Sequence, residues 1–201
     1  MKIDAYRNIP QEEIELERTL PDGRSYTLNH PDELVVPMKY QGDNGSAKNS
    51  QGWEESRSNY FQQLQSEHPE YFSKENTALI KDGKSPYIDQ QFTENLPQYE
   101  EYTGEKLIHH HVGGDGQAVA VPQSIHRGYG EIHNPERDLG IRSEAEQYSA
   151  QCKQVCENDP SQYGKTSDEL KGVVASQENA VTHDNDMATE QELSEEMEQE
   201  M

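Results

Sequence analysis

The spacing of apolar positions becomes helical from residue 53 onward. Intervals of seven, one and three residues predict one face of a first helix, made up of Trp53, Tyr60, Phe61 and Leu64. A second helix is expected over residues 73–83, with Leu79 and Ile80 facing inward. A third is expected over residues 89–102 and should be interrupted at Pro97. These elements precede the segment that carries the candidate chemistry.

The N-terminal part of the chain shows a different pattern. Short β-like pieces over residues 25–28 and 34–36 are separated by turn-forming residues. Residues 42–52 are rich in glycine, asparagine and serine, which predicts a flexible linker. We therefore expect a flexible, β-like N-terminal segment over residues 1–51, followed by a folded domain over residues 52–141.

Acidic residues accumulate toward the C-terminus. The 201-residue chain has a formal net charge of −22, from 17 basic and 39 acidic side chains. Half of that excess lies in residues 142–201, a segment of 60 residues with only six Leu, Ile, Val or Phe. Such a composition is typical of disorder, because it cannot bury enough apolar surface to offset the entropy of folding. We therefore expect residues 142–201 to form an acidic, largely disordered tail.

The most informative stretch is residues 105–134, which reads EKLIHHHVGGDGQAVAVPQSIHRGYGEIHN. Residues 106–112 predict a strand, the glycine-rich residues 113–116 a turn, and residues 117–121 a second strand. Pro122 stands where a helix can begin, because the first turn makes no use of the N–H that proline lacks. The local order is therefore strand, turn, strand, and then a short helix or loop.

Five of the eight histidines lie in this stretch: His109, His110, His111, His126 and His133. Imidazole is the commonest transition-metal ligand and a general base near neutral pH. Side chains alternate along a strand, so His109 and His111 share one face and His110 points to the other. Adjacent histidines on a hairpin, facing a segment with two more, can converge on one cation. The pattern therefore predicts a metal or catalytic site.

The stretch IHHHVGGDGQAVAVPQSIHRGYGEIHN resembles the HNH/Endonuclease VII superfamily of nucleases, and within it the bacterial polymorphic-toxin branch with a triple-His signature. The resemblance is strong over residues 85–141 and weaker upstream to Trp53. It implies an α+β fold in which a small ββα-metal (His-Me) finger packs on the upstream helices. It also implies hydrolysis of phosphodiester bonds with one divalent cation.

The resemblance also implies roles for the histidines. In the colicin DNases of this superfamily, the first of an adjacent histidine pair binds the metal and the second is the general base. Carried over by position, His109 is a metal ligand and His110 is the base. A register shifted by one makes His110 the ligand and His111 the base. In both registers, His126 and His133 complete the metal site.

Two features depart from the colicin pattern. The last two histidines are seven residues apart, with Gly128 and Gly130 between them, whereas neighbours on one helical turn are about four apart. A looped or bulged arm is therefore expected. The asparagine that names the HNH motif has no clear equivalent before Pro122. Arg127, beside His126, is a candidate phosphate-binding residue, because a guanidinium matches the geometry of a phosphate.

The predicted function is that of a metal-dependent endonuclease, acting as a bacterial toxin or effector, with a histidine base that activates water. An all-imidazole site suits Zn, Ni or Mn, and Mg is compatible with additional water ligands. DNA is the favoured substrate and RNA the alternative, and family analogy implies an immunity protein as a partner. The alternative function is a catalytically inactive metal-binding or protein-interaction module.

Neither a membrane span nor a signal peptide is expected. No run approaches the roughly 18 apolar residues that a membrane helix needs. The first residues are too acidic and polar for a signal peptide. The expected location is therefore the bacterial cytoplasm, or outside the cell after export without a signal peptide.

The net negative charge argues against a nucleic-acid substrate, because proteins that bind nucleic acid usually present a basic patch. Residues 85–141 are themselves net −6. Lys81, Lys84 and Lys106 are expected to border the cleft and to offset part of this charge. A further hypothesis places the acidic tail in the cleft, so that deletion of residues 142–201 raises activity.

Overall fold

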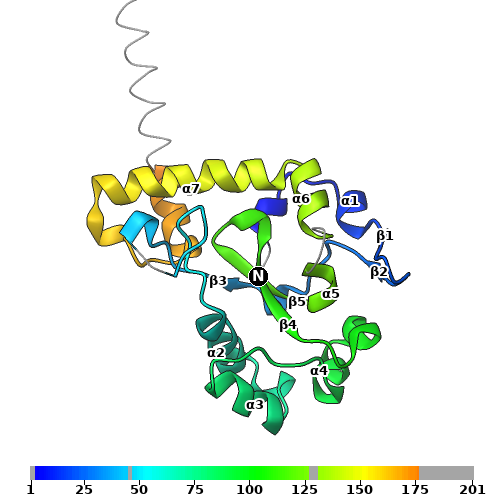
Figure 1. Ribbon diagram of the computed structural model, residues 1–201. Coiled ribbons are helices and arrows are strands. Elements are labelled where there is room, and N and C mark those ends of the chain that lie inside the picture. Colours follow the sequence, from blue (N-terminus) through cyan, green and yellow to red (C-terminus); the bar gives the residue numbers. More distant parts are fainter. Residues whose placement is uncertain (1–2, 45–46, 127–130, 177–201) are drawn as a thin grey trace, which may run out of the picture.

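Helices surround a small antiparallel sheet in the computed structural model of the protein (Figure 1). The structure describes residues 3–44, 47–126 and 131–176. Helices and antiparallel strands are mixed along the chain, so the fold class is α+β, as predicted. Within the described ranges, no helix combines the length and apolar character needed to cross a membrane.

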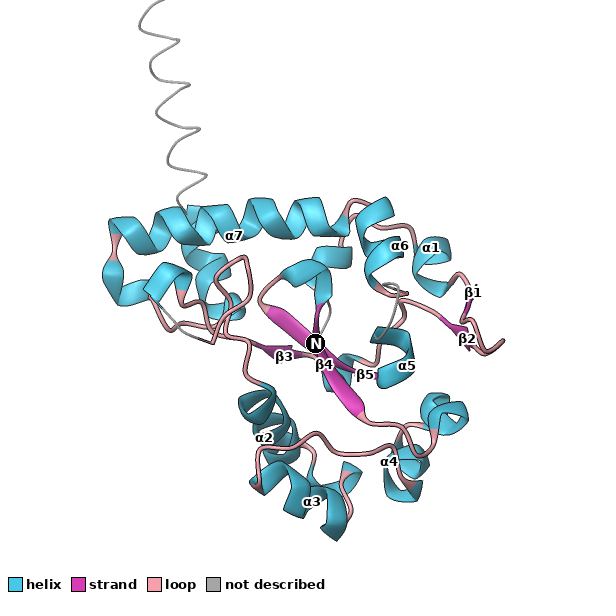
Figure 2. Cartoon of the chain, viewed as in Figure 1, coloured by secondary structure: helices cyan, strands magenta, loops and turns pink. Residues whose placement is uncertain are grey.

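The central sheet has the strand order β3-β5-β4, and its neighbouring strands are antiparallel. β4 (Leu107–His111) and β5 (Gln117–Pro122) form the predicted hairpin. β3 (Val36–Pro37) pairs with the other edge of β5. Every residue of β5 is buried, because β5 is the middle strand and helices lie on both sides of the sheet (Figure 2).

Three helices with capped N-termini precede the hairpin in the chain, and the first of them packs against it. They are α2 (Arg57–Glu67), α3 (Lys74–Lys81) and α4 (Gln90–Asn95), which follow the N-caps Ser56, Ser73 and Asp89. Each cap side chain accepts a hydrogen bond from a backbone N–H of the first turn. The helices expected over residues 73–83 and 89–102 are confirmed, and the break at Pro97 separates α4 from a 3-10 helix. The first helix is shorter than predicted, since Trp53 precedes it.

The remaining elements are short, apart from one long helix along one side of the molecule (Figure 1). The short helices are α1 (Gln11–Glu15), α5 (Gln123–His126) and α6 (His133–Asp138), and the long helix is α7 (Ile141–Asn158). A two-stranded ribbon is formed by β1 (Arg18–Thr19) and β2 (Ser25–Tyr26). Residues 167–176 are also helical.

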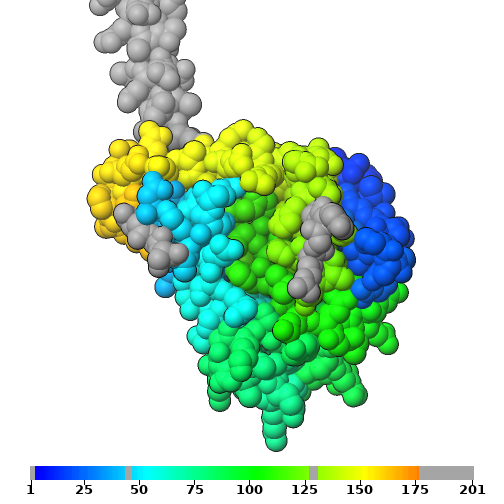
Figure 3. All heavy atoms as spheres, viewed as in Figure 1, coloured from blue at the N-terminus to red at the C-terminus, as the bar shows by residue number. Residues whose placement is uncertain are grey.

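The N-terminal residues belong to the same core as the hairpin, which corrects the expectation of a flexible segment over residues 1–51. Leu28, Leu34 and Val36 are 0% exposed and lie in one hydrophobic cluster with residues of β4 and β5. Figure 3 shows the dark-blue N-terminal residues packed against the body of the molecule. The linker expected over residues 42–52 is also wrong where the structure describes it, because the Asn49 side chain donates a hydrogen bond to the Gly114 carbonyl at 2.8 Å.

The C-terminal segment is folded as far as residue 176. The expected disorder of residues 142–201 is therefore wrong for residues 142–176. α7 buries a face of mostly small residues at helical spacing: Ile141, Ala145, Ser149, Cys152, Val155 and Cys156. A second hydrophobic cluster joins α7 and residues 167–176 to Tyr40 and Trp53, where the cyan segment meets the yellow and orange ones in Figure 3. The rest of the predicted tail, residues 177–201, lies outside the described residues, and so does any contact it makes with the cleft.

Trp53 anchors this second cluster. Its indole is 0% exposed and donates a hydrogen bond from Nε1 to the Ser149 hydroxyl at 2.8 Å. Trp53→Ala should lower the free energy of unfolding by about 3–5 kcal/mol, because it empties a large buried volume. Urea denaturation measures this change. Leu16→Ala is the control, since Leu16 is 50% exposed and its loss should change stability by less than about 0.5 kcal/mol. Equal effects of the two variants would contradict the packing of α7 on Trp53.

Candidate metal and catalytic site

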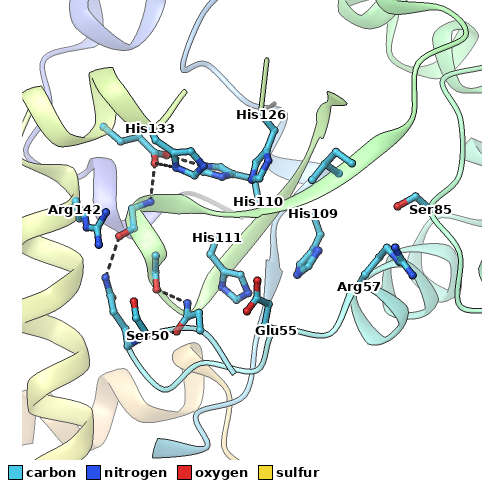
Figure 4. A pocket seen from close by; sticks show the side chains of 16 residues that line it. Ser50, Glu55, Arg57, Ser85, His109, His110, His111, His126, His133 and Arg142 are labelled. Carbon is cyan, nitrogen blue, oxygen red and sulfur yellow. Dashed lines mark hydrogen bonds and ion pairs between the residues drawn. The ribbon is translucent and has the colours of Figure 1, made fainter. Parts of the chain in front are cut away.

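The hairpin divides its three adjacent histidines between two faces, as strand alternation predicts. The ring centroids of His109 and His111 lie 5.5 Å apart. The His110 ring lies instead 5.2 Å from His126 and 4.9 Å from His133. Figure 4 shows His110 grouped with His126 and His133, while His109 and His111 extend from β4 toward α2 and Glu55. The site therefore contains two groups of imidazoles.

The first group, His110, His126 and His133, could hold a metal ion. One ring nitrogen from each residue lies within 4.8 Å of those of the other two. His126 ends α5 and His133 begins α6, so the seven-residue interval spans two helices and not one helical turn. Arg127, the predicted phosphate-binding residue, lies outside the described residues.

Glu136 supports this histidine cluster from α6. Its Oε1 lies 2.8 Å from His110 Nε2, and its Oε2 accepts a hydrogen bond from the Gly113 N–H at 3.1 Å. Gly113 has a φ of 61°, a backbone conformation that favours glycine and directs this N–H toward Glu136. Burial raises the pKa of Glu136 to about 7, although the Gly113 hydrogen bond and His133 oppose the shift.

His111 is oriented by the backbone. Its Nδ1 lies 2.7 Å from the carbonyl oxygen of Asp115. A carbonyl oxygen can only accept a hydrogen bond, so Nδ1 carries the proton and Nε2 of the neutral ring has the free lone pair. Nε2 is buried, and within the described part of the chain it makes no hydrogen bond of good geometry, although the Glu54 backbone lies near enough to oppose the lowering of the His111 pKa. This tautomer is the one that a general base requires.

His109 lies on the same face as His111 and packs near Tyr60, with the two ring centroids 5.9 Å apart. Desolvation, followed by the neighbouring imidazoles, lowers its pKa to about 3. The structure thus brings His110 to His126 and His133 and leaves His109 outside that group. The roles of the histidines stay predictions, but the geometry favours the register in which His110 is the ligand.

Burial favours the neutral form of three further imidazoles, those of His110, His111 and His126. Desolvation lowers the pKa of His126 to about 4, and it also lowers the pKa values of His110 and His111. At His110 the neighbouring imidazoles of His133 and His111 add to the shift. A neutral imidazole has the lone pair that a metal ion or a proton needs. These side chains are therefore in the form that can bind a metal or accept a proton at neutral pH.

A cleft of about 440 Å³ joins the two histidine groups. All five predicted histidines line it, together with two exposed arginines, Arg57 at the start of α2 and Arg142 near the start of α7. Guanidinium groups suit a phosphate ligand. In Figure 4, Arg57 and Ser85 lie beside His109, whereas Arg142 lies on the side of His133.

Sequence reasoning did not single out Glu136, Asp115 as the partner of His111, or the two arginines of the cleft. Glu136 follows His133 by three residues on a helix, a spacing that places two side chains on one face and could have indicated it. The Asp115 contact uses a backbone carbonyl, which leaves no signal in residue type. Arg57 and Arg142 reach the cleft only through tertiary packing and carry no local motif.

The donor set fits a divalent transition metal. His110 Nδ1 is buried, and within the described ranges it has no hydrogen-bond partner. Glu136 is a buried carboxylate, and in the described part of the chain it contacts the imidazoles of His110 and His133, the Gly113 N–H and the Tyr6 hydroxyl. A cation bound by His110, His126 and His133 would use the free nitrogen and compensate the buried charge.

A β-hairpin followed by short helices, with imidazoles converging between them, defines the class of ββα-metal or His-Me finger folds. Residues 32–134, just over half of the chain, match the family model of HNH/Endo VII superfamily nuclease toxins with a HHH motif. The chain therefore belongs to this family. Neither a curated protein nor a solved structure matches it.

Proposed function

We propose that this protein is a metal-dependent endonuclease in which His111 is the general base. The observation that carries the proposal is the free Nε2 of His111, opposite an Nδ1 that the Asp115 carbonyl fixes in the protonated form. His111 shares its cleft with the His110 cluster. Membership of a family of nuclease toxins supports phosphodiester hydrolysis as the reaction.

Each residue then has a separate task. His110, His126 and His133 would hold one divalent cation, and Glu136 would orient His110 by accepting a hydrogen bond from its Nε2–H. That cation neutralises charge on the phosphate and the leaving oxygen when it is bound. His111 Nε2 accepts a proton from water as the water oxygen attacks phosphorus. The bond from phosphorus to the leaving oxygen breaks, and solvent protonates that oxygen, which gives a phosphomonoester and a hydroxyl.

The proposal extends to the substrate and the partners. The family indicates nucleic acid, and we propose DNA in preference to RNA, with Zn, Ni, Mn or Mg as the metal. By analogy with other toxins, an immunity protein would be the protein partner. The site of action would be a bacterial cytoplasm, either that of the producing cell or one reached by export without a signal peptide.

Cleavage of supercoiled plasmid DNA, and of RNA of matching sequence, tests this function. The full chain should nick DNA with at least one of Zn, Ni, Mn and Mg, lose the activity in a chelator, and regain it when metal returns. Nicking that persists in the chelator would remove the metal dependence, and cleavage of RNA alone would overturn the DNA preference. Metal binding with no cleavage of either substrate would favour the inactive metal-binding module.

A further inference from the structure

A second groove of about 460 Å³ continues from the histidine cleft between β4 and α3. The two hollows share Arg57, Ser85, Ile108 and His126, so they are continuous. Arg57 and Ser85, labelled in Figure 4, mark the place where the groove leaves the cleft. The other residues that line the groove are Leu79, Lys84, Tyr87, Lys106 and Gln123. The proposed hydrolysis assigns none of these five a task.

The groove gathers positive charge in an acidic protein. Arg57, Lys84 and Lys106 line it, and none of its lining residues is acidic, although the chain as a whole is net −22. The Gly83 carbonyl fixes the Arg57 guanidinium by accepting hydrogen bonds of 3.2 and 2.9 Å. Lys84 pairs with the exposed Asp82 at 3.3 Å, a type of pair that contributes little. For Lys106, the described part of the chain offers no ion pair. These cations are therefore available to an anionic ligand.

Tyr87 presents an aromatic ring in the same groove. It is 39% exposed, and in the described ranges only Leu16 is a comparably exposed large apolar residue. Two hydrogen bonds of 2.8 Å join its backbone to the buried side chain of Asn76, so the fold holds the backbone of Tyr87 in place at the groove. Lys106 Nζ lies 5.7 Å from the ring centroid. One exposed aromatic residue is ordinary on a protein surface. An exposed ring on a well-held backbone, in a groove lined by three cations and continuous with the proposed hydrolytic site, indicates a ligand.

We propose that this groove binds an unpaired stretch of nucleic acid next to the scissile phosphate, with a base stacked on Tyr87 and the flanking phosphates held by Arg57, Lys84 and Lys106. The proposal rests on the proposed nuclease function and adds a preference for single strands. A base can lie flat on a tyrosine ring only where it is not stacked inside a duplex. A cationic groove with an aromatic ring is the arrangement that binds single strands with little sequence preference.

Single-strand binding also resolves the conflict between an acidic protein and an anionic substrate. Duplex DNA carries one charge per about 1.7 Å of its axis. The affinity of a protein for duplex DNA therefore depends strongly on how many phosphates the protein neutralises. A single strand has a weaker dependence on salt per phosphate contact. Stacking adds binding that does not depend on the net charge of the protein. A few local cations and one ring are therefore sufficient here, where a broad basic face is lacking.

Equilibrium binding in the presence of a chelator tests the groove without turnover. Fluorescence anisotropy of the full chain would compare labelled single-stranded DNA and RNA of about 12 nucleotides with a duplex of the same sequence. Tyr87→Ala should weaken single-strand binding by roughly five- to a hundredfold and duplex binding by less than about twofold. Tyr87→Phe retains the ring and should bind single strands as the unaltered protein does. Lys106→Ala should weaken binding and reduce its dependence on salt.

Lys81→Ala is the matched charge control, because Lys81 is an exposed lysine of α3 that does not line the groove. Undiminished single-strand binding by Tyr87→Ala, tighter binding of duplex by the unaltered protein, or an equal loss in Lys81→Ala would overturn the proposal. Single-strand binding that depends on Tyr87, with no cleavage under any metal, would retain the groove and reject the nuclease. Metal-dependent cleavage together with single-strand binding that is unchanged in Tyr87→Ala would retain the nuclease and reject the groove.

Discussion

Replacing His111 with alanine is expected to slow phosphodiester cleavage by about 10²–10⁴-fold, the range that a positioned general base contributes. The free Nε2 of His111 is the proton acceptor in the proposed reaction, and alanine has no group that replaces it. Single-turnover rates at saturating metal measure the loss. Metal affinity should stay within about threefold of the unaltered protein, because His111 is not among the three histidines that converge.

His109→Ala is the control for this result, since it removes an imidazole from the same face of β4 and leaves the Asp115 contact intact. We expect its rate to change much less than that of His111→Ala. Added imidazole should restore part of the rate of His111→Ala if the missing group acts only as a base. A large loss in His109→Ala, together with full activity in His111→Ala, would transfer the role of base to His109.

Local rules account for the parts of the site that the sequence predicted. The hairpin follows from alternating apolar positions around a glycine-rich turn, so residues 107–111 and 117–122 form strands close to where they are expected. The same alternation separates His110 from its two neighbours. It could not show which face meets His126 and His133, because that depends on how α5 and α6 turn back over the sheet. The choice of register therefore needed the tertiary structure.

The expected tail shows why composition can mislead. Counting Leu, Ile, Val and Phe gives residues 142–201 a low apolar content. The buried face of α7 is built largely from alanine, serine and cysteine, which that count omits. Such small side chains allow α7 to pack closely on Trp53 and Tyr40, and the Ser149 hydroxyl is satisfied by the indole N–H. Helical spacing of these residues was a better signal of folding than their hydrophobicity.

The metal site is expected to depend on His126 more strongly than on any supporting residue. His126→Ala should weaken the binding of Zn or Ni by more than about 100-fold, because it removes one of three converging imidazoles. Glu136→Gln should weaken binding by about 10–100-fold, since it weakens the acceptor that orients His110 but leaves all three ligands in place. Calorimetric titration measures both affinities without any nucleic acid present. Thermal unfolding of each variant verifies that it is folded.

His109→Ala separates the two registers in the same titration. His109 lies beside Tyr60 and His111 and outside the converging group, so its loss should change metal affinity by less than about threefold. An affinity loss equal to that of His126→Ala would make His109 a ligand and His110 the candidate base, which is the first of the two registers that the sequence allowed. His111→Ala would then retain its cleavage rate. The metal titration and the cleavage rates must therefore agree on one register, and the titration does not depend on how substrate is bound.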